Sequence, residues 1–181
     1  RAEGGRPHAR EHRCQRAAVQ SSVQHAVVRE GDPARCSAVL PHLWSDGEFL
    51  TTADMLFTLE TLQNPDTQSP GFNTWQGVVG ERVSEREMLF SLKNPYAFFN
   101  DNLKNFKIVP RHIFNNIPPS NLRLSNYNLE PVGSGPYKFV KYDKRKDGFI
   151  TKYYLKANEF YGDNPPFIKN FNLAFFANEN E

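Results

Sequence analysis

The composition of the chain changes sharply at about residue 43, and this change decides which residues can build a fold. Residues 1–42 contain no Lys, no Asn and no Phe, Tyr or Trp, whereas residues 43–181 contain ten Lys, 17 Asn and every aromatic side chain. Large aromatic and aliphatic side chains supply most of the burial that stabilises a core. The sequence therefore predicts that the folded part begins at about residue 43.

Residues 1–42 are predicted to be disordered, or not to be native sequence of the protein encoded after them, and they receive no domain assignment. A change this sharp exceeds what a domain boundary within one gene of uniform base composition produces. It indicates a frameshifted start or a wrongly assigned gene end. The alternative is a basic, flexible leader, since the segment carries seven Arg against four acidic residues.

Histidine and cysteine are concentrated in the same first segment, but their spacing does not fit a metal site. Structural zinc sites pair cysteines roughly two to four residues apart with a matching pair of histidines or cysteines. The sequence therefore predicts no metal, no cofactor and no disulfide. The residues considered and rejected as ligands are His8, His12, Cys14, His25, Cys36 and His42.

The balance of charge after residue 42 argues against nucleic-acid binding. Residues 43–181 carry 15 basic and 16 acidic side chains, a net charge of −1. The lysines between residues 138 and 146 stand beside Asp143 and Asp147, which indicates a solvated turn and not a phosphate-binding surface. No run of about 18 apolar residues and no signal peptide is visible, so an export signal of this protein would lie outside the chain.

Local signals predict a helix, a hairpin and a second helix between residues 51 and 106. Thr51 and Asp54 form a capping box, in which each side chain bonds the other residue's main-chain N–H. An apolar stripe at helical spacing follows, and the hairpin shows period-two alternation. The predicted elements are a helix from Thr51 to Leu62, strands Gly77–Val83 and Glu87–Leu92, and a helix within Tyr96–Phe106 with Phe99, Leu103 and Phe106 inward.

The last third of the chain is predicted to form an antiparallel sheet after a loop rich in Asn and Pro at 115–131. The segment Gly133-Ser134-Gly135-Pro136 is interpreted as a tight backbone crossing that side chains would obstruct. Three strands follow, and in the third Phe171, Leu173 and Phe175 alternate with Asn, so that one face is apolar. The predicted strands are Tyr137–Tyr142, Phe149–Leu155 and Ile168–Phe176.

Candidate catalytic residues all have better structural explanations, so the sequence predicts a protein that is not an enzyme. Asp46 belongs to an Asp-Gly turn and Asp54 to a helix cap. His112 has no nucleophile motif near it, and the Ser of Gly133-Ser134-Gly135 leads into a strand, not the helix of a nucleophile elbow or phosphate loop. Five aromatic residues could stack on a sugar or a base but are assigned to a core: Phe72, Trp75, Tyr96, Phe98 and Phe99.

Several motifs, in one order, resemble the extracytoplasmic solute-binding proteins of the oligopeptide/nickel-binding family 5, which serve ABC transporters. The family typically shows a W-S-D-G-x-P-L-T-A-D-D-V helix start, a strand ending in K-x-P-Y-x-P-F, an I-x-P-x-H-I turn, P-V-G-T-G-P-Y-x-F and N-x-x-Y-x-G-x-x-P-x-I. The matching segments are Trp44–Gly47 with Leu50–Leu59, Phe90–Ala97, Ile108–Ile113, Pro131–Phe139 and Asn158–Pro166. Glu48-Phe49 and Phe98 depart from these patterns.

The resemblance implies an α/β fold with mixed sheets, as a fragment of the type II periplasmic-binding-protein fold. Residues 43–107 would correspond to the accessory domain, and residues 108–181 to part of ligand-binding lobe one. The second lobe, with most of the ligand pocket, is missing, so no ligand-binding residue can be named.

The same resemblance implies the function and the partners. The expected function is a receptor that captures peptides outside the cytoplasmic membrane and delivers them to an ABC permease, working as a monomer in the periplasm or anchored on the outer face of that membrane. A nickel or other small-solute receptor of the same family, and a non-transport interaction module that retains the fold, remain as alternatives.

Overall fold

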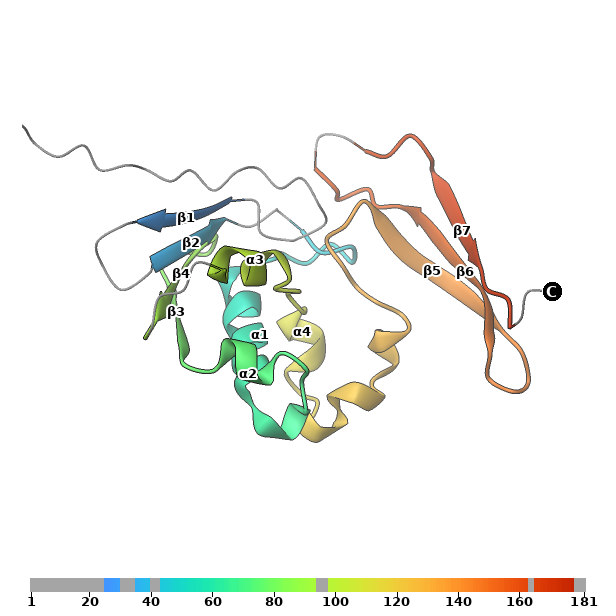
Figure 1. The fold of residues 1–181 in the computed structure, drawn as a ribbon. Coiled ribbons are helices and arrows are strands. Elements are labelled where there is room, and N and C mark those ends of the chain that lie inside the picture. The colour runs from blue at the N-terminus through green and yellow to red at the C-terminus, as the bar shows by residue number, and fades with distance from the viewer. Residues whose placement is uncertain (1–24, 30–34, 40–42, 94–97, 163–164, 178–181) are drawn as a thin grey trace, which may run out of the picture.

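Two antiparallel sheets and a set of short helices make up the fold (Figure 1). The structure, a computed structural model, describes residues 25–29, 35–39, 43–93, 98–162 and 165–177. One sheet has the strand order β1-β2-β4-β3 and the other the order β5-β6-β7. We call the first sheet and the helices packed with it the helical unit. The strands are β1 (His25–Arg29), β2 (Arg35–Val39), β3 (Val78–Arg82), β4 (Glu87–Leu92), β5 (Tyr137–Lys144), β6 (Ile150–Ala157) and β7 (Asn170–Ala174).

The helices are short, and all of those described lie between β2 and β5 in the sequence. The longest, α1, is predicted by its capping box and ends one residue before Asn64, which caps its C-terminus. The helices are α1 (Thr52–Gln63), α2 (Phe72–Trp75), α3 (Phe99–Lys104) and α4 (Arg111–Phe114), with 3-10 turns at Pro65–Thr67, Pro119–Leu124 and Asn126–Asn128. The predicted second helix is therefore shorter than expected, and the predicted loop at 115–131 contains two 3-10 turns.

Two short strands lie within residues 1–42, the segment predicted to be disordered or not native sequence. β1 and β2 pair antiparallel, and β2 pairs with β4, with Cys36 opposite Phe90. Strand pairing uses main-chain hydrogen bonds, so it needs none of the aromatic side chains on which the prediction was based. The remaining residues of 1–42 lie outside the described part, and whether the segment is native sequence stays a prediction.

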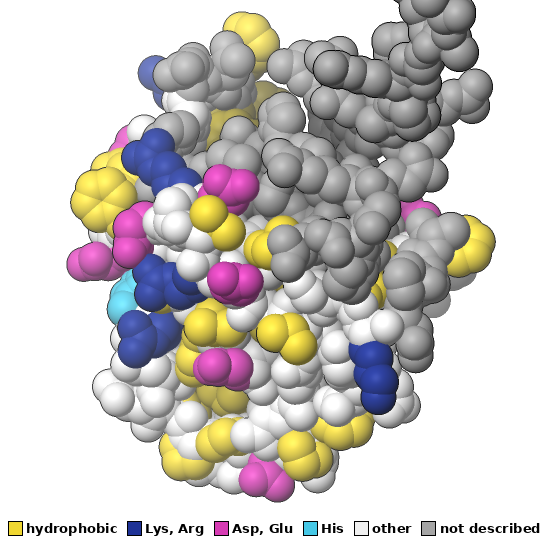
Figure 2. All heavy atoms as spheres, turned by 90° about the vertical axis from the view of Figure 1, so that its left-hand side faces the viewer, with side chains coloured by type: hydrophobic (Ala, Val, Ile, Leu, Met, Phe, Trp, Pro, Cys, Tyr) yellow, Lys and Arg dark blue, Asp and Glu magenta, His cyan; other side chains and the backbone are white. Residues whose placement is uncertain are grey.

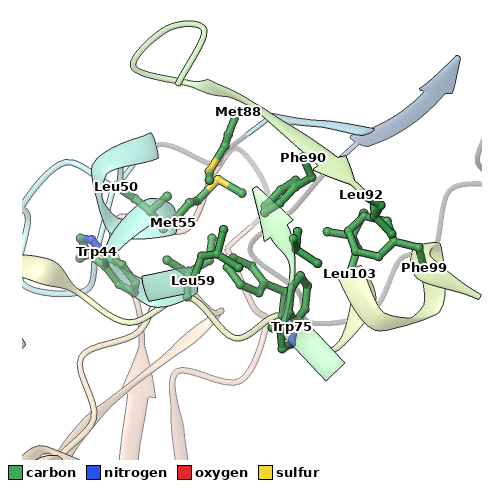
Figure 3. Close-up of a cluster of buried hydrophobic side chains, with 13 residues drawn as sticks. Trp44, Leu50, Met55, Leu59, Trp75, Met88, Phe90, Leu92, Phe99 and Leu103 are labelled. Carbon is green, nitrogen blue, oxygen red and sulfur yellow. The ribbon is translucent and has the colours of Figure 1, made fainter. Parts of the chain in front are cut away.

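The core of the helical unit is an aromatic and aliphatic cluster between α1 and the β3–β4 hairpin (Figure 3). The rings of Trp75 and Phe106 lie 4.7 Å apart, and that of Phe90 lies 5.7 Å from Phe106. The assignment of Trp75 and Phe99 to the core is confirmed, because both are buried. The assignment of Phe98 to the core is wrong, because this residue precedes the first turn of α3 and its side chain is exposed. Phe72 is half-buried, and Tyr96 lies outside the described residues.

Gly80 of β3 allows α1 to approach the hairpin closely. A Cβ atom at this position would collide with the end of the Met88 side chain and lie 2.9 Å from Cδ2 of Leu59. Met88 and Leu59 are fully buried, so the space they fill is available only because residue 80 has no side chain.

The three-stranded sheet is confirmed as predicted, and its two faces differ. Tyr142 stands opposite Tyr153, and Leu155 opposite Phe171, so that these side chains share one face. On that face the rings of Phe139 and Tyr153 lie 5.2 Å apart. Phe171, Leu173 and Phe175 remain 41%, 39% and 44% exposed, which confirms the alternation but leaves this apolar face half uncovered.

Candidate functional site

Four segments that are distant in the sequence meet where the helical unit joins the three-stranded sheet. They are the turn at 44–47, the start of α4, the segment 131–138 and the turn after β6. All four belong to the motifs singled out in the sequence, and we call their meeting point the motif junction, defined by Ser45, Asp46, His112, Gly133, Lys138 and Asn158.

Ser45 ties the first turn to the segment that leads into β5. Its N–H donates to the carbonyl of Gly133 at 2.8 Å, and the N–H of Gly133 donates to Oγ of Ser45 at 3.3 Å. The Nζ atom of Lys138 donates to the carbonyl of Ser45 at 3.3 Å. Because Ser45 is buried, these bonds are shielded from water and hold the two segments in register.

Asp46 and His112, which the sequence analysis treated separately, form a pair. Nε2 of His112 lies 2.8 Å from Oδ2 of Asp46, and Oδ1 of Asp46 accepts from the N–H of Glu48 at 3.2 Å. A carboxylate–imidazole pair also occurs in hydrolytic triads. Here, however, Nε2 itself contacts the carboxylate that also closes the Asp-Gly turn, which is the geometry of a structural tie between this turn and α4.

Asp54 has a second role that the capping box did not predict. Its Oδ2 accepts from the N–H of Thr51 at 2.8 Å, as predicted, while its Oδ1 accepts from the N–H of Arg111 at 2.8 Å. The hydroxyl of Thr58, which donates to the carbonyl of Asp54, also accepts from the N–H of Val109 at 3.0 Å. The buried N-terminal half of α1 thus holds the chain at 109–111.

Asn158 closes the junction from the side of the sheet. Its Nδ2 donates to the carbonyl of Gly135 at 2.9 Å, and its Oδ1 accepts from the N–H of Phe160 at 3.1 Å. Its own N–H donates to the carbonyl of Pro136 at 2.9 Å. The residue is only 1% exposed, so its buried amide finds its hydrogen-bond partners in main-chain groups and not in water.

The predicted tight crossing at Gly133 and Gly135 is wrong. A Cβ atom at either position would meet no described atom within 4 Å. The close approach occurs instead at Gly47, which has φ of +95° and whose added Cβ would lie 3.3 Å from the ring of Phe160. A left-handed conformation facing an aromatic ring is where glycine is required, so the glycine that fits the interpretation is in the first motif and not the fourth.

Lys138 and Glu159 form the charged rim of the junction. Their side chains meet at 2.6 Å, and Nζ of Lys138 lies 5.6 Å from the centre of the Phe160 ring. The hydrogen bond from Lys138 lowers the pKa of the Glu159 carboxyl. The Glu159 carboxylate therefore stays ionised at neutral pH and contributes a charged contact between β5 and the turn after β6.

The described part of the chain contains neither a cluster of metal-ligating side chains nor a membrane-spanning helix. Among the described residues, no three His, Cys, Asp or Glu side chains gather as a metal site would require. Of the six candidates from the sequence, four lie outside the described residues, and His25 and Cys36 lie in β1 and β2, whose side chains are not described. No described helix is long and apolar enough to cross a membrane.

Comparison with known families bears directly on the motifs that meet at the junction. The sequence model described as bacterial extracellular solute-binding proteins, family 5 Middle, matches residues 42–181. The chain belongs to this family. The match begins within one residue of the point at which the composition changes, so the family 5 sequence is the part of the chain after that change.

Among its relatives, the oligopeptide-binding protein AppA of Bacillus subtilis is 32% identical over 126 residues, which are 68% of this chain and 22% of that protein. The chain thus spans less than a quarter of the length of this family 5 relative. Protein XP55 of Streptomyces lividans is 33% identical over 140 residues, 76% of this chain and 24% of that protein.

Solved structures give the same fold. The ABC transporter substrate-binding protein CtaP of Listeria monocytogenes matches with a TM-score of 0.77 at 25% identity, covering 88% of this chain and 32% of that one. NikZ of Campylobacter jejuni, solved with Ni(L-His), gives 0.72 at 25% identity, over 86% and 30%. The predicted fold, a fragment of the type II periplasmic-binding-protein architecture, is confirmed. The division at residue 107 stays a prediction, although Ile108 lies in the core of the helical unit.

Replacing Asn158 by alanine is expected to destabilise the contact between the sheet and the motif junction. The change removes one donor and one acceptor that bond main-chain groups of Gly135 and Phe160, and each lost hydrogen bond is worth about 0.5–1.5 kcal/mol. Loss of amide protection from hydrogen exchange at Phe160 is the expected observation. Asn170→Ala, on an exposed position of β7, serves as the control, and equal protection in both variants would contradict the assigned role.

Proposed function

We propose that the chain is part of the substrate-binding receptor of an ABC importer, which captures oligopeptides outside the cytoplasmic membrane and passes them to a permease. The observation that carries the proposal is the convergence of the family motifs on one junction, from Ser45–Gly133 at one side to Asn158–Gly135 at the other. Because the motif residues hydrogen-bond to one another, they hold the helical unit and the sheet together as a scaffold. We infer that the residues that contact the ligand lie in other parts of the receptor.

The uncovered apolar face supports the view that this scaffold is one wall of a larger molecule. Phe171, Leu173 and Phe175 are about two-fifths exposed on a face lined by stacked tyrosines. A contiguous exposed apolar surface marks a place where further protein packs. We infer that other segments of a longer polypeptide cover this face, in keeping with relatives of which the chain spans 22–25%.

The mechanism follows from a two-lobed architecture. Two α/β lobes close on the ligand around a hinge, and the ligand favours the closed state because only that state buries it. An extended peptide is held through main-chain hydrogen bonds, and its side chains occupy pockets. In this mechanism the motif junction keeps the helical unit and the sheet of the first lobe fixed to each other while the lobes move.

The remaining predictions on partners belong to the same proposal. The receptor acts as a monomer outside the cytoplasmic membrane, does no bond chemistry, and binds no nucleic acid. The alternative ligand is nickel or another small solute, since NikZ was solved with Ni(L-His) and AppA with a nonapeptide. A peptide is favoured as the ligand because this chain is 32% identical to the oligopeptide-binding protein AppA.

A chimeric receptor tests the proposed function. Residues 43–181 would replace the matching stretch of Bacillus subtilis AppA, and calorimetric titration with its nonapeptide would follow. Because the junction residues provide the scaffold, we expect affinity within about tenfold of that of AppA, which corresponds to about 1.4 kcal/mol. A chimera that unfolds cooperatively but gives no heat of peptide binding would count against the function.

A further inference from the structure

The two faces of the three-stranded sheet differ in charge as well as in polarity. On the face opposite the stacked tyrosines, Lys141 stands across from Tyr154, and Asp143 across from Lys152. A register shift between Phe139 and Lys141 places Lys141 on the polar face. We call this surface the basic face. It consists of Lys141, Lys152 and Lys156 on the strands and Lys144, Arg145 and Lys146 at the turn.

Positive charge is concentrated on the basic face. Between residues 139 and 157 there are six cations and two carboxylates, a net charge of +4, whereas the rest of 43–181 carries nine cations and 14 carboxylates, a net charge of −5. The near-neutral total of the folded part therefore conceals a strong separation. The face of the molecule in Figure 2, on the other side from this sheet, carries acidic, basic and hydrophobic side chains intermixed.

The two carboxylates on the basic face do not neutralise it. Asp143 lies 3.6 Å from Nζ of Lys141, and Asp147 lies 3.2 Å from Arg145. The remaining four cations, Lys144, Lys146, Lys152 and Lys156, are exposed and form no ion pair with another described residue. The hydrogen bond from Tyr154 lowers the pKa of Asp143, so this carboxylate is correctly counted as negatively charged at neutral pH.

The shape and composition of the surface fit a broad anionic partner better than a compact ligand. Strands of eight residues span about 26 Å, at roughly 3.3 Å per residue. Five of the six cations are Lys. Protein–protein interfaces are depleted in Lys and enriched in Arg, and single strands of nucleic acid need open aromatic faces, whereas Lys141 lies over the ring of Tyr154 at 4.5 Å.

We propose that the basic face binds the anionic phospholipid headgroups of a membrane surface. Cations near such a surface each strengthen binding roughly fivefold, and the attraction disappears beyond a Debye length. The basic face points away from the apolar face, which we assign to the rest of the polypeptide. Contact of the basic face with a membrane would leave the packing on the apolar face undisturbed. Such contact requires no bound peptide.

Vesicle co-sedimentation of the 181-residue chain tests the proposal. We expect binding to vesicles of phosphatidylcholine with about one-third phosphatidylglycerol, and its loss at about 0.5 M salt, where the Debye length falls to about 4 Å. The variant Lys144→Gln/Lys152→Gln/Lys156→Gln should bind at least about tenfold more weakly. The matched control, Arg86→Gln/Lys93→Gln/Lys107→Gln, removes the same charge from exposed positions of the helical unit.

Both variants keep residues 1–42, so a contribution from that basic segment cancels between them. The control should retain binding within about twofold of the original chain, because the cations that it removes belong to the helical unit and not to the basic face. Equal weakening in the two variants would overturn the proposal, since only net charge would then matter. Equal binding to vesicles of pure phosphatidylcholine would overturn it as well, because the apolar face would then be the site. None of these outcomes depends on the chimera's peptide binding.

Discussion

Replacing Phe90 by alanine is expected to lower the free energy of unfolding of the helical unit by about 3–5 kcal/mol. Phe90 is fully buried on β4, and its ring lies 6.3 Å from those of Trp75 and Phe99 and 5.7 Å from that of Phe106. Its removal leaves a cavity among side chains that come from α2, from α3 and from the segment after α3, and these cannot all shift to fill it.

The measurement is urea unfolding followed by the fluorescence of Trp44 and Trp75, both buried in this unit. A loss of this size is a large fraction of the about 5–15 kcal/mol that stabilises an ordinary domain. The control is Phe98→Ala, because Phe98 is 71% exposed, and its effect should stay within about 0.5 kcal/mol. Similar midpoints for the two variants would show that the aromatic cluster is not the core.

Replacing Asp54 by alanine is expected to lower the free energy of unfolding by about 2–4 kcal/mol, because the helix cap is lost and two main-chain N–H donors lose their acceptor. The carboxylate is 4% exposed and accepts from the N–H groups of Thr51 and Arg111. Asp54→Asn keeps one oxygen for one of these donors and should lose less. The same urea experiment measures both variants.

A matched exposed acidic residue provides the control for Asp54. Asp66 lies in the first turn of the 3-10 helix at Pro65–Thr67 and is exposed, so Asp66→Ala should change stability by no more than about 0.5 kcal/mol. If Asp54→Ala proved as mild as Asp66→Ala, the carboxylate would not be what holds the start of α4 against α1.

Elements with local signals were predicted well. The capping box at Thr51 and the alternation of Met88, Phe90 and Leu92 correctly indicated α1 and the β3–β4 hairpin, because such patterns report which side of one element is buried. The same holds for the three-stranded sheet. The strands before residue 43 were missed because β1 pairs with β2, and β2 with β4, through main-chain groups, which composition does not reveal.

The motif junction could be predicted only in part. Each motif was recognised, but the contact of Ser45 with Gly133, 88 residues away, depends on how the two units pack. The close approach that was predicted at Gly133 occurs at Gly47, where the ring of Phe160 lies nearby. A sequence shows where glycine occurs but not which atoms face it. The basic face was missed because its charge was summed with the acidic remainder of the chain, and because its lysines near Asp143 and Asp147 were assigned to a solvated turn.

Calorimetric titration of the 181-residue chain with a mixed pool of tri- to pentapeptides tests most directly the claim that this chain holds one wall of a two-walled cleft. Association costs about 4–15 kcal/mol, and hydrogen bonds that stay in contact with water return only about 1 kcal/mol each. The account predicts no submicromolar binding. Submicromolar binding by the chain alone would contradict it, because a complete ligand site would then lie within these residues.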